Sequence, residues 1–206
     1  MLVLRVGPFP PLDPVVRAES LARTIAGHTG EIWVFGYGSL MWDSELPFSE
    51  RKPAILHDFR RLFCIWTAHA RGTPEQPGLA LGLLPTVGEQ CNGVALKVDK
   101  SRADAALTAL WDREMWTDIY RPVWRKLATP QGMLDAIVFE VNTASQQFAG
   151  ELSLQEMAQN IAKAVGVFGT CRDYLFDTAQ SLQRGGVNSE EFRELCDTVE
   201  RLKVAC

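Results

Sequence analysis

The sequence is poor in the residues that build metal sites and disulfide frameworks. It has 206 residues, of which five are cysteine and three are histidine. No two cysteines form a C-x-x-C pair, and His28, His57 and His69 do not have the spacing of metal ligands. An odd number of cysteines without such a pair favours reduced thiols in a cytoplasmic protein, and we expect no zinc site.

Long apolar runs and clusters of basic residues are also missing. No apolar run approaches the ~20 residues of a transmembrane helix, so we expect no membrane partner. The first residues are broken by Pro8, Pro10 and Pro11 and lack a basic segment followed by an apolar core, so no signal peptide is expected. The net charge of -4 argues against a nucleic-acid partner.

Several catalytic and nucleotide-binding motifs do not occur. The chain has neither the three-glycine dinucleotide fingerprint nor a Gly-Lys-Ser/Thr P-loop, and no G-x-S-x-G elbow that would present a nucleophilic serine. Cys64 falls within an apolar strand pattern and is interpreted as an inert core thiol. The residues therefore offer no obvious enzyme nucleophile.

The composition is that of an ordinary globular protein, with 47% hydrophobic and 22% charged residues. The length is sufficient for one domain with a substantial core, and no linker divides the chain. We therefore predict a single domain over residues 1–206. It would comprise an N-terminal lead and helix (1–30), a barrel core with one helix (31–141) and C-terminal helices (151–206).

Periodicity and turn residues predict an α+β fold. Residues 14–27 are typical of an amphipathic helix, 43–57 of a surface connection and 71–78 of a loop, and Gly88 is placed in a turn. A capping pair, Ser101 and Asp104, opens a second helix, and a full capping box, Ser153 to Glu156, opens the first of three last helices. The two other terminal helices are expected from about 170 to 183 and from 188 or 189 onward. Strands are expected at 31–35, 59–66, 79–84, 91–98, 120–128 and 133–141. Without regular βαβ alternation, this order indicates a mainly antiparallel sheet or small β-barrel with flanking helices.

The most informative stretch runs from Glu31 to Trp42. An apolar strand is followed at once by Gly36-Tyr37-Gly38-Ser39. Two glycines at a strand end allow a sharp turn and a close approach to a ligand, and inward-turned N–H groups would bind an anion. The alternative is an ordinary strand that ends in a glycine-rich turn.

Glu114 is the second informative residue. It follows Leu107, Leu110 and Trp111 at helical spacing, so a helix that persists to this position places its carboxylate on the apolar face. Burial there would raise the pKa of the carboxylate and suit it to proton transfer near neutral pH. The alternative is a helix that ends at Asp112, with Glu114 paired to Arg113 or Arg121.

Four motifs, in this order, resemble the ChaC-type γ-glutamylcyclotransferases of bacteria, over roughly residues 17 to 185. They are Phe35-Gly-Tyr-Gly-Ser-Leu40, Arg71-Gly-Thr-Pro74 with Pro77-Gly78, Arg113-Glu114-Met115 with Tyr120, and Gly169 with Tyr174-Leu175.

The resemblance implies a cofactor-free enzyme that cleaves glutathione to 5-oxoproline and cysteinylglycine, on a small mixed barrel. It implies that Glu114 is the catalytic residue. We also expect a cytoplasmic enzyme, with no metal, that is a monomer or weak dimer. The substrate-binding residues implied are Gly36, Tyr37, Gly38, Ser39, Leu40, Met41, Arg71, Tyr120 and Tyr174.

The sequence departs from the family pattern at three places. Asp118 and Ile119 precede Tyr120 where the family often has two glycines, and His69-Ala70 differs from the commonest residues before Arg71. Cys171 replaces an asparagine at the start of the Tyr174 helix, which Thr170 could cap instead. We expect these changes to affect substrate preference more than reaction type.

Two alternatives remain open. The first is a cyclotransferase for other γ-glutamyl amines or peptides. The second is a non-catalytic regulatory or binding protein on the same fold.

Overall fold

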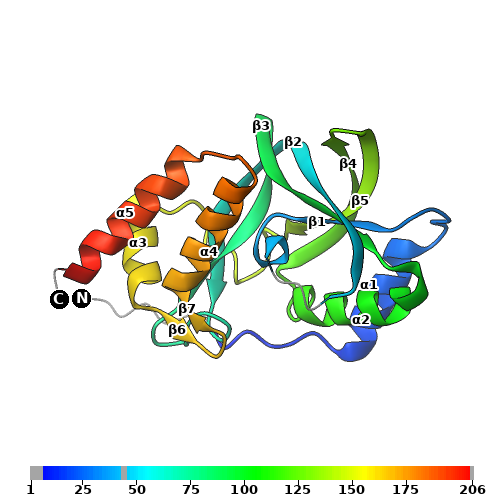
Figure 1. Cartoon of the computed structure of the whole chain (residues 1–206). Coiled ribbons are helices and arrows are strands. Elements are labelled where there is room, and N and C mark those ends of the chain that lie inside the picture. Colours follow the sequence, from blue (N-terminus) through cyan, green and yellow to red (C-terminus); the bar gives the residue numbers. More distant parts are fainter. Residues whose placement is uncertain (1–6, 43–45, 205–206) are drawn as a thin grey trace. The chain divides into compact units, whose positions relative to one another are not determined.

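The computed structural model describes residues 7–42 and 46–204 (Figure 1). Contacts within the chain divide it into two compact units. We call Pro10–Arg61 with Leu83–Asn142 the barrel unit, and Met1–Phe9 with Leu62–Gly82 and Thr143–Cys206 the helical unit. The expectation of one domain over the whole chain stays a prediction, and each unit is described by itself below.

The barrel unit is built around five strands that close into a barrel in the order β1-β3-β2-β4-β5. Strand β1 is antiparallel to β3 and parallel to β5, and β4 and β5 form an antiparallel hairpin with Thr129 opposite Gly132. The predicted α+β class with a mainly antiparallel barrel is thus confirmed. The strands are β1 (Trp33–Gly36), β2 (Phe48–Thr67), β3 (Gly78–Val98), β4 (Tyr120–Thr129) and β5 (Gly132–Val141), and the parts of β2 from Leu62 and of β3 up to Gly82 belong to the helical unit.

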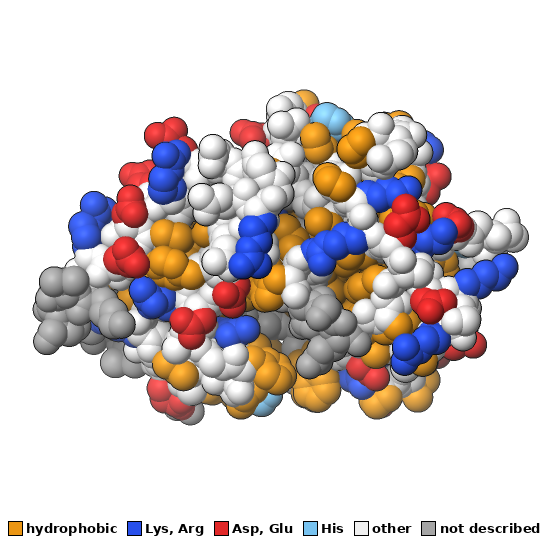
Figure 2. All heavy atoms as spheres, in the orientation of Figure 1, with side chains coloured by type: hydrophobic (Ala, Val, Ile, Leu, Met, Phe, Trp, Pro, Cys, Tyr) orange, Lys and Arg blue, Asp and Glu red, His pale blue; other side chains and the backbone are white. Residues whose placement is uncertain are grey.

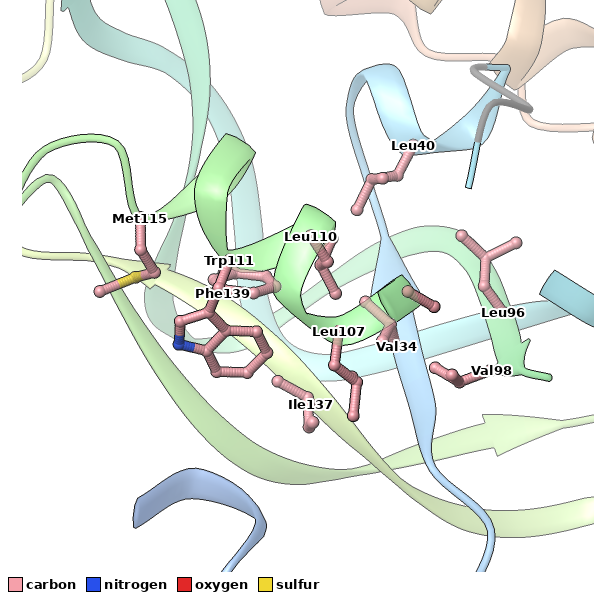
Figure 3. Close-up of a cluster of buried hydrophobic side chains, with 11 residues drawn as sticks. Val34, Leu40, Leu96, Val98, Leu107, Leu110, Trp111, Met115, Ile137 and Phe139 are labelled. Atoms are coloured by element: carbon pink, nitrogen blue, oxygen red, sulfur yellow. The ribbon is translucent and has the colours of Figure 1, made fainter. Parts of the chain in front are cut away.

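Helix α2 (Ala103–Glu114) packs its apolar face on the barrel strands (Figure 3). Trp111 is almost fully buried, and its ring meets that of Phe139 edge to face at 5.2 Å. Burying such side chains contributes roughly 1.5–3 kcal/mol each, which fixes α2 on the barrel. The cluster comprises Val34, Leu40, Leu96, Val98, Ala106, Leu107, Leu110, Trp111, Met115, Ile137 and Phe139.

Two predictions for β2 and β3 were wrong. Residues 43–57 are not a surface connection throughout, because β2 begins at Phe48; residues 43–45 lie outside the described residues. The alternation of buried and exposed residues in β2 is interrupted at Asp58. Ala54 and Leu56 are buried two positions apart, as in a regular strand, but Asp58 has φ 61° and the next buried residue is Phe59. A single left-handed residue of this kind shifts the alternation by one position.

The predicted strands 79–84 and 91–98 are one strand, and Gly88 lies within it rather than in a turn. Gly88 has φ 85°, a conformation that glycine adopts without strain. Its N–H donates to Asp58 Oδ1 at 2.9 Å, so the irregular residue of β3 is hydrogen-bonded to the irregular residue of β2.

The N-terminus of α2 also differs from the prediction. Asp99, not Ser101, supplies the capping side chain: its Oδ1 accepts from Ser101 N at 2.9 Å and from Ser101 Oγ at 2.8 Å. The cap belongs to a short 3₁₀ helix, η2 (Lys100–Arg102), which precedes α2. The N-terminal helix α1 (Pro14–Ile25) is as expected, and Asp13 Oδ1 caps it at Val15 N.

The helical unit contains α3 (Leu154–Lys163), α4 (Cys171–Arg184) and α5 (Glu190–Val204), with a small hairpin of β6 (Val165–Gly166) and β7 (Gly169–Thr170) that the sequence did not predict. Ser153 and Glu156 form the predicted capping box of α3, and Thr170 Oγ1 caps α4 at Asp173 N. Phe63 packs against Tyr174 and Phe192 at ring distances of 6.0 and 5.8 Å.

Charged side chains of both signs are interspersed on the face of the protein shown in Figure 2. Within residues 7–42 and 46–204, the helices are all too short or too polar to cross a membrane.

Candidate active site

The segment after β1 forms a tight loop, Gly36–Met41, which we call the substrate loop. Leu40 and Met41 are each only 6% exposed, and Leu40 belongs to the cluster that holds α2. These two predicted site residues are therefore buried, and the side chain of Leu40 anchors the loop in this cluster.

The substrate loop uses some of its amides internally. Met41 N donates to Gly38 O at 2.8 Å and Trp42 N to Ser39 O at 3.0 Å, which closes the 3₁₀ turn η1 (Ser39–Met41). The amides of Gly38, Ser39 and Leu40 have no acceptor among the described residues. The amides that could bind an anion are thus these three consecutive ones, and not all the amides of the loop.

Tyr37 is directed into the barrel. It is 7% exposed, and its hydroxyl donates to the backbone oxygen of Phe139 on β5 at 2.7 Å. This bond joins the substrate loop to β5, the strand that is parallel to β1. Its observed role is to hold the loop in place.

Arg61 on β2 contacts the substrate loop, which the sequence did not reveal. Its Nη1 donates to Tyr37 O at 2.6 Å and its Nη2 to Asn92 O at 3.0 Å. The half-buried guanidinium therefore ties the substrate loop to β3. The only sequence signal was an arginine within an apolar strand pattern.

Glu114 is the last residue of α2, with a side chain 15% exposed. Arg113 Nε lies 3.2 Å from Glu114 Oε1, and Arg113 Nη2 donates to Ser39 Oγ. Both sequence interpretations hold in part, because the helix reaches Glu114 and the ion pair with Arg113 also forms. The structure thus brings the carboxylate and the substrate loop together through one guanidinium.

Tyr120 begins β4 and is half-buried, with its ring 6.4 Å from that of Phe139. It belongs to the same unit as the substrate loop, as does the exposed Asp118, whose backbone oxygen accepts from Asn142 Nδ2 at 2.9 Å. The Asp118-Ile119 departure therefore lies in the turn that leads into Tyr120.

The other two predicted binding residues, Arg71 and Tyr174, lie together in the helical unit. The Arg71 guanidinium is 5.6 Å from the centre of the Tyr174 ring and donates from Nη1 to Phe168 O and, at 3.4 Å, to Thr170 O. The loop that begins at Arg71 is tightly closed, because a Cβ on Gly72 would lie 2.2 Å from Gly78 N. Glycine is required there by close backbone approach.

Cys171 replaces the family asparagine with a group that still donates and accepts. Its Sγ accepts from Leu79 N at 3.3 Å and donates to Leu79 O at 3.2 Å. Burial raises the pKa of the thiol to about 12. The residue is therefore a protonated structural link between α4 and the start of β3.

Within residues 7–42 and 46–204, no three His, Cys, Asp or Glu side chains gather as metal ligands would. At the substrate loop, the barrel unit brings together the Glu114 carboxylate, the Arg113 guanidinium and the Ser39 hydroxyl. Beside them are three amides without an acceptor among the described residues. These groups can bind an anion and transfer a proton.

Known proteins share the fold of this chain and part of its sequence. The crystal structure of a glutathione-specific γ-glutamyl cyclotransferase from yeast matches with a TM-score of 0.76 and 22% identity, over 84% of this chain and 97% of that chain, so the two share a fold. The glutathione-specific γ-glutamylcyclotransferase of Escherichia coli K12 is 37% identical over 90% of this chain and 81% of the relative. γ-Glutamylcyclotransferase 2-3 of Arabidopsis thaliana is 30% identical over 83% of this chain and 89% of the relative.

The fold is thus that of the γ-glutamylcyclotransferases. The family model described as ChaC-like protein matches residues 32–202. The chain belongs to the ChaC-like protein family.

Proposed function

We propose that this protein is a glutathione-specific γ-glutamylcyclotransferase, which converts glutathione to 5-oxoproline and cysteinylglycine. The observation that carries the proposal is the link from Glu114 through Arg113 to Ser39 of the substrate loop. The E. coli and yeast relatives named above support the choice of glutathione.

The reaction is intramolecular. The α-amine of the γ-glutamyl group attacks the γ-carbonyl carbon, a C–N bond to that amine forms, and the bond from the same carbon to the cysteine nitrogen breaks. The α-ammonium group loses two protons as it becomes the lactam N–H, and the departing nitrogen gains two as it becomes the ammonium group of cysteinylglycine. One proton is carried from the attacking nitrogen to the departing nitrogen, and the other is exchanged with solvent. Since both reacting groups belong to one substrate molecule, much of the rate enhancement comes from holding the γ-glutamyl chain with its amine close to the γ-carbonyl carbon.

Glu114 is the group proposed to carry the proton. It would accept it from the ammonium group and then give it to the departing nitrogen, so no second acid is needed. Arg113 would orient the carboxylate through the 3.2 Å contact to Oε1.

The remaining predicted residues are proposed to bind substrate. The amides of the substrate loop would hold the α-carboxylate, and Tyr120 would flank the γ-glutamyl group. Arg71 and Tyr174 are assigned on the family pattern, and their mutual contact supports a shared role.

We also propose that the enzyme is cytoplasmic, a monomer or weak dimer, and independent of metals, cofactors and nucleic acids. The odd cysteine count without a C-x-x-C pair supports a reducing compartment, and the net charge of -4 opposes binding to nucleic acid.

The test is a turnover assay on the purified protein with glutathione, γ-glutamylalanine and γ-glutamyl-ε-lysine, with 5-oxoproline measured by mass spectrometry. We expect product from glutathione far above the other two. Product mainly from another substrate would support the broader cyclotransferase. Binding without product from any of them would support a regulatory protein.

A further inference from the structure

Arg61 contacts the substrate loop at both ends of its glycine-rich turn. Nη1 lies 2.6 Å from Tyr37 O and 3.7 Å from Met41 Sδ, while Nη2 lies 3.0 Å from Asn92 O. All of these residues belong to the barrel unit. Because a guanidinium is a rigid planar fork, its two donors fix the Tyr37 carbonyl relative to β3.

The position of the Tyr37 carbonyl determines the direction of the next amide. Tyr37 O and the N–H of Gly38 belong to one trans peptide plane, in which the carbonyl and the N–H point in opposite directions. Since Arg61 binds the carbonyl, the Gly38 N–H points away from Arg61. That amide has no acceptor among the residues described.

The same orientation extends to the next two amides. Met41 N bonds to Gly38 O at 2.8 Å and Trp42 N to Ser39 O at 3.0 Å, so the turn that follows Gly38 is closed. Arg61 Nη1 contacts the two ends of this turn, at Tyr37 O (2.6 Å) and Met41 Sδ (3.7 Å). One side chain outside the loop therefore holds the segment that carries the three successive amides.

We propose that Arg61 is a positioning residue of the cyclotransferase: it aims the amides of Gly38, Ser39 and Leu40 at the α-carboxylate of the γ-glutamyl group. The proposal rests on the proposed function and deepens it, because it explains how the loop amides are held in position to bind the α-carboxylate. Arg61 itself does not touch the substrate.

The test uses Arg61→Lys, which keeps the charge but cannot place two fixed donors on Tyr37 O and Asn92 O at once. We expect the KM for glutathione to rise ~10–100-fold, since hydrogen bonds to a charged group are lost. The kcat should stay close to that of the wild type, because the carboxylate is held equally in the ground state and the transition state.

A matched substrate separates this role from a general loss of structure. 4-Aminobutanoyl-cysteinylglycine keeps the amine and the γ-carbonyl of glutathione but lacks the α-carboxylate. Arg61→Lys should change the kcat/KM of this substrate little. The losses in kcat/KM caused by the substitution and by removal of the carboxylate should therefore be strongly non-additive. A loss of equal size with both substrates would overturn the proposal.

Arg125→Lys is the control, since Arg125 is an arginine of the same unit that pairs with Glu140 at 2.6 Å. It should leave both substrates unaffected. Arg61→Met, which keeps most of the apolar stem, should raise KM as Arg61→Lys does.

Hydrogen exchange tests the geometry without substrate. The amides of Met41 and Trp42 should exchange faster in Arg61→Lys than in the wild type, and unchanged exchange would overturn the proposal. An active wild type with a normal KM in Arg61→Lys would refute only the role of Arg61. A wild type that turned over no γ-glutamyl compound would refute the proposed function itself.

Discussion

Arg113 donates from Nη2 to Ser39 Oγ and so joins the end of α2 to the substrate loop. The same guanidinium contacts Glu114, and the two side chains are 30% and 15% exposed. A partly exposed ion pair adds little to stability, so we infer that this contact serves mainly to orient the Glu114 carboxylate. The position of the carboxylate relative to the loop should therefore be sensitive to Arg113.

We predict that Arg113→Met lowers kcat about 10²-fold, because a displacement of ~1 Å can cost that much. Ser39→Ala should have a smaller effect, since the contact between Arg113 and Glu114 remains. The double variant should be no worse than Arg113→Met, as steady-state kinetics would show. Arg23→Met, at an arginine whose side chain is 71% exposed, is the control and should be normal. Fully additive effects would contradict the proposed coupling.

We predict that Glu114→Gln loses ~10²–10⁴ of kcat, as expected for a general acid or base. Glutathione binding, measured by calorimetry, should survive because the substrate loop is intact. Glu140→Gln is a matched control: its carboxylate is 13% exposed and is also paired with an arginine. Near-normal turnover by Glu114→Gln would exclude this carboxylate, and Asp118→Asn would be the next variant to assay.

We predict that Gly93→Ala destabilises the barrel unit by ~1–3 kcal/mol and raises KM. A Cβ on Gly93 would lie 2.4 Å from Gly36 O and 2.7 Å from the Phe35 ring, so the start of the substrate loop must move. Urea unfolding and steady-state kinetics measure the two effects. Gly30→Ala is the control, because its nearest contact would be 3.4 Å from His28 Nε2. Unchanged stability and KM in Gly93→Ala would show that this close approach is unimportant.

Most of the fold was predictable because its signals are local. The hairpin of β4 and β5, the capping box at Ser153 and the cap at Thr170 follow from residues within one turn of each other. The full lengths of β2 and β3 were not predictable, since Asp58 interrupts the alternation of β2 and Gly88 that of β3. What compensates is a hydrogen bond between positions 30 residues apart, which no local pattern contains.

The candidate site divides in the same way. Glu114 was predictable from helical spacing, and the substrate loop from its two glycines. Arg61 was not, because its role depends on two backbone oxygens on other elements. The hydrogen bond from the Tyr37 hydroxyl to Phe139 O was not predictable either, because it joins residues 102 positions apart; the role of Tyr37 in substrate binding stays a prediction.

Cys171 gives a prediction for the pH dependence of stability. Burial raises the pKa of the folded-state thiol from 9.0 to about 12, so above pH 9 the folded state holds a proton that the unfolded state loses. The stability from this group is fully present below pH 9 and declines as the pH rises toward 12, by up to about 1.4 kcal/mol per pH unit. Cys171→Ser can keep the donor and the acceptor to Leu79 but does not titrate in this range. We therefore expect the wild type, compared with Cys171→Ser in urea unfolding between pH 8 and 10.5, to lose stability more steeply above pH 9. Parallel stability curves for the two proteins would show that the thiol does not carry this linkage.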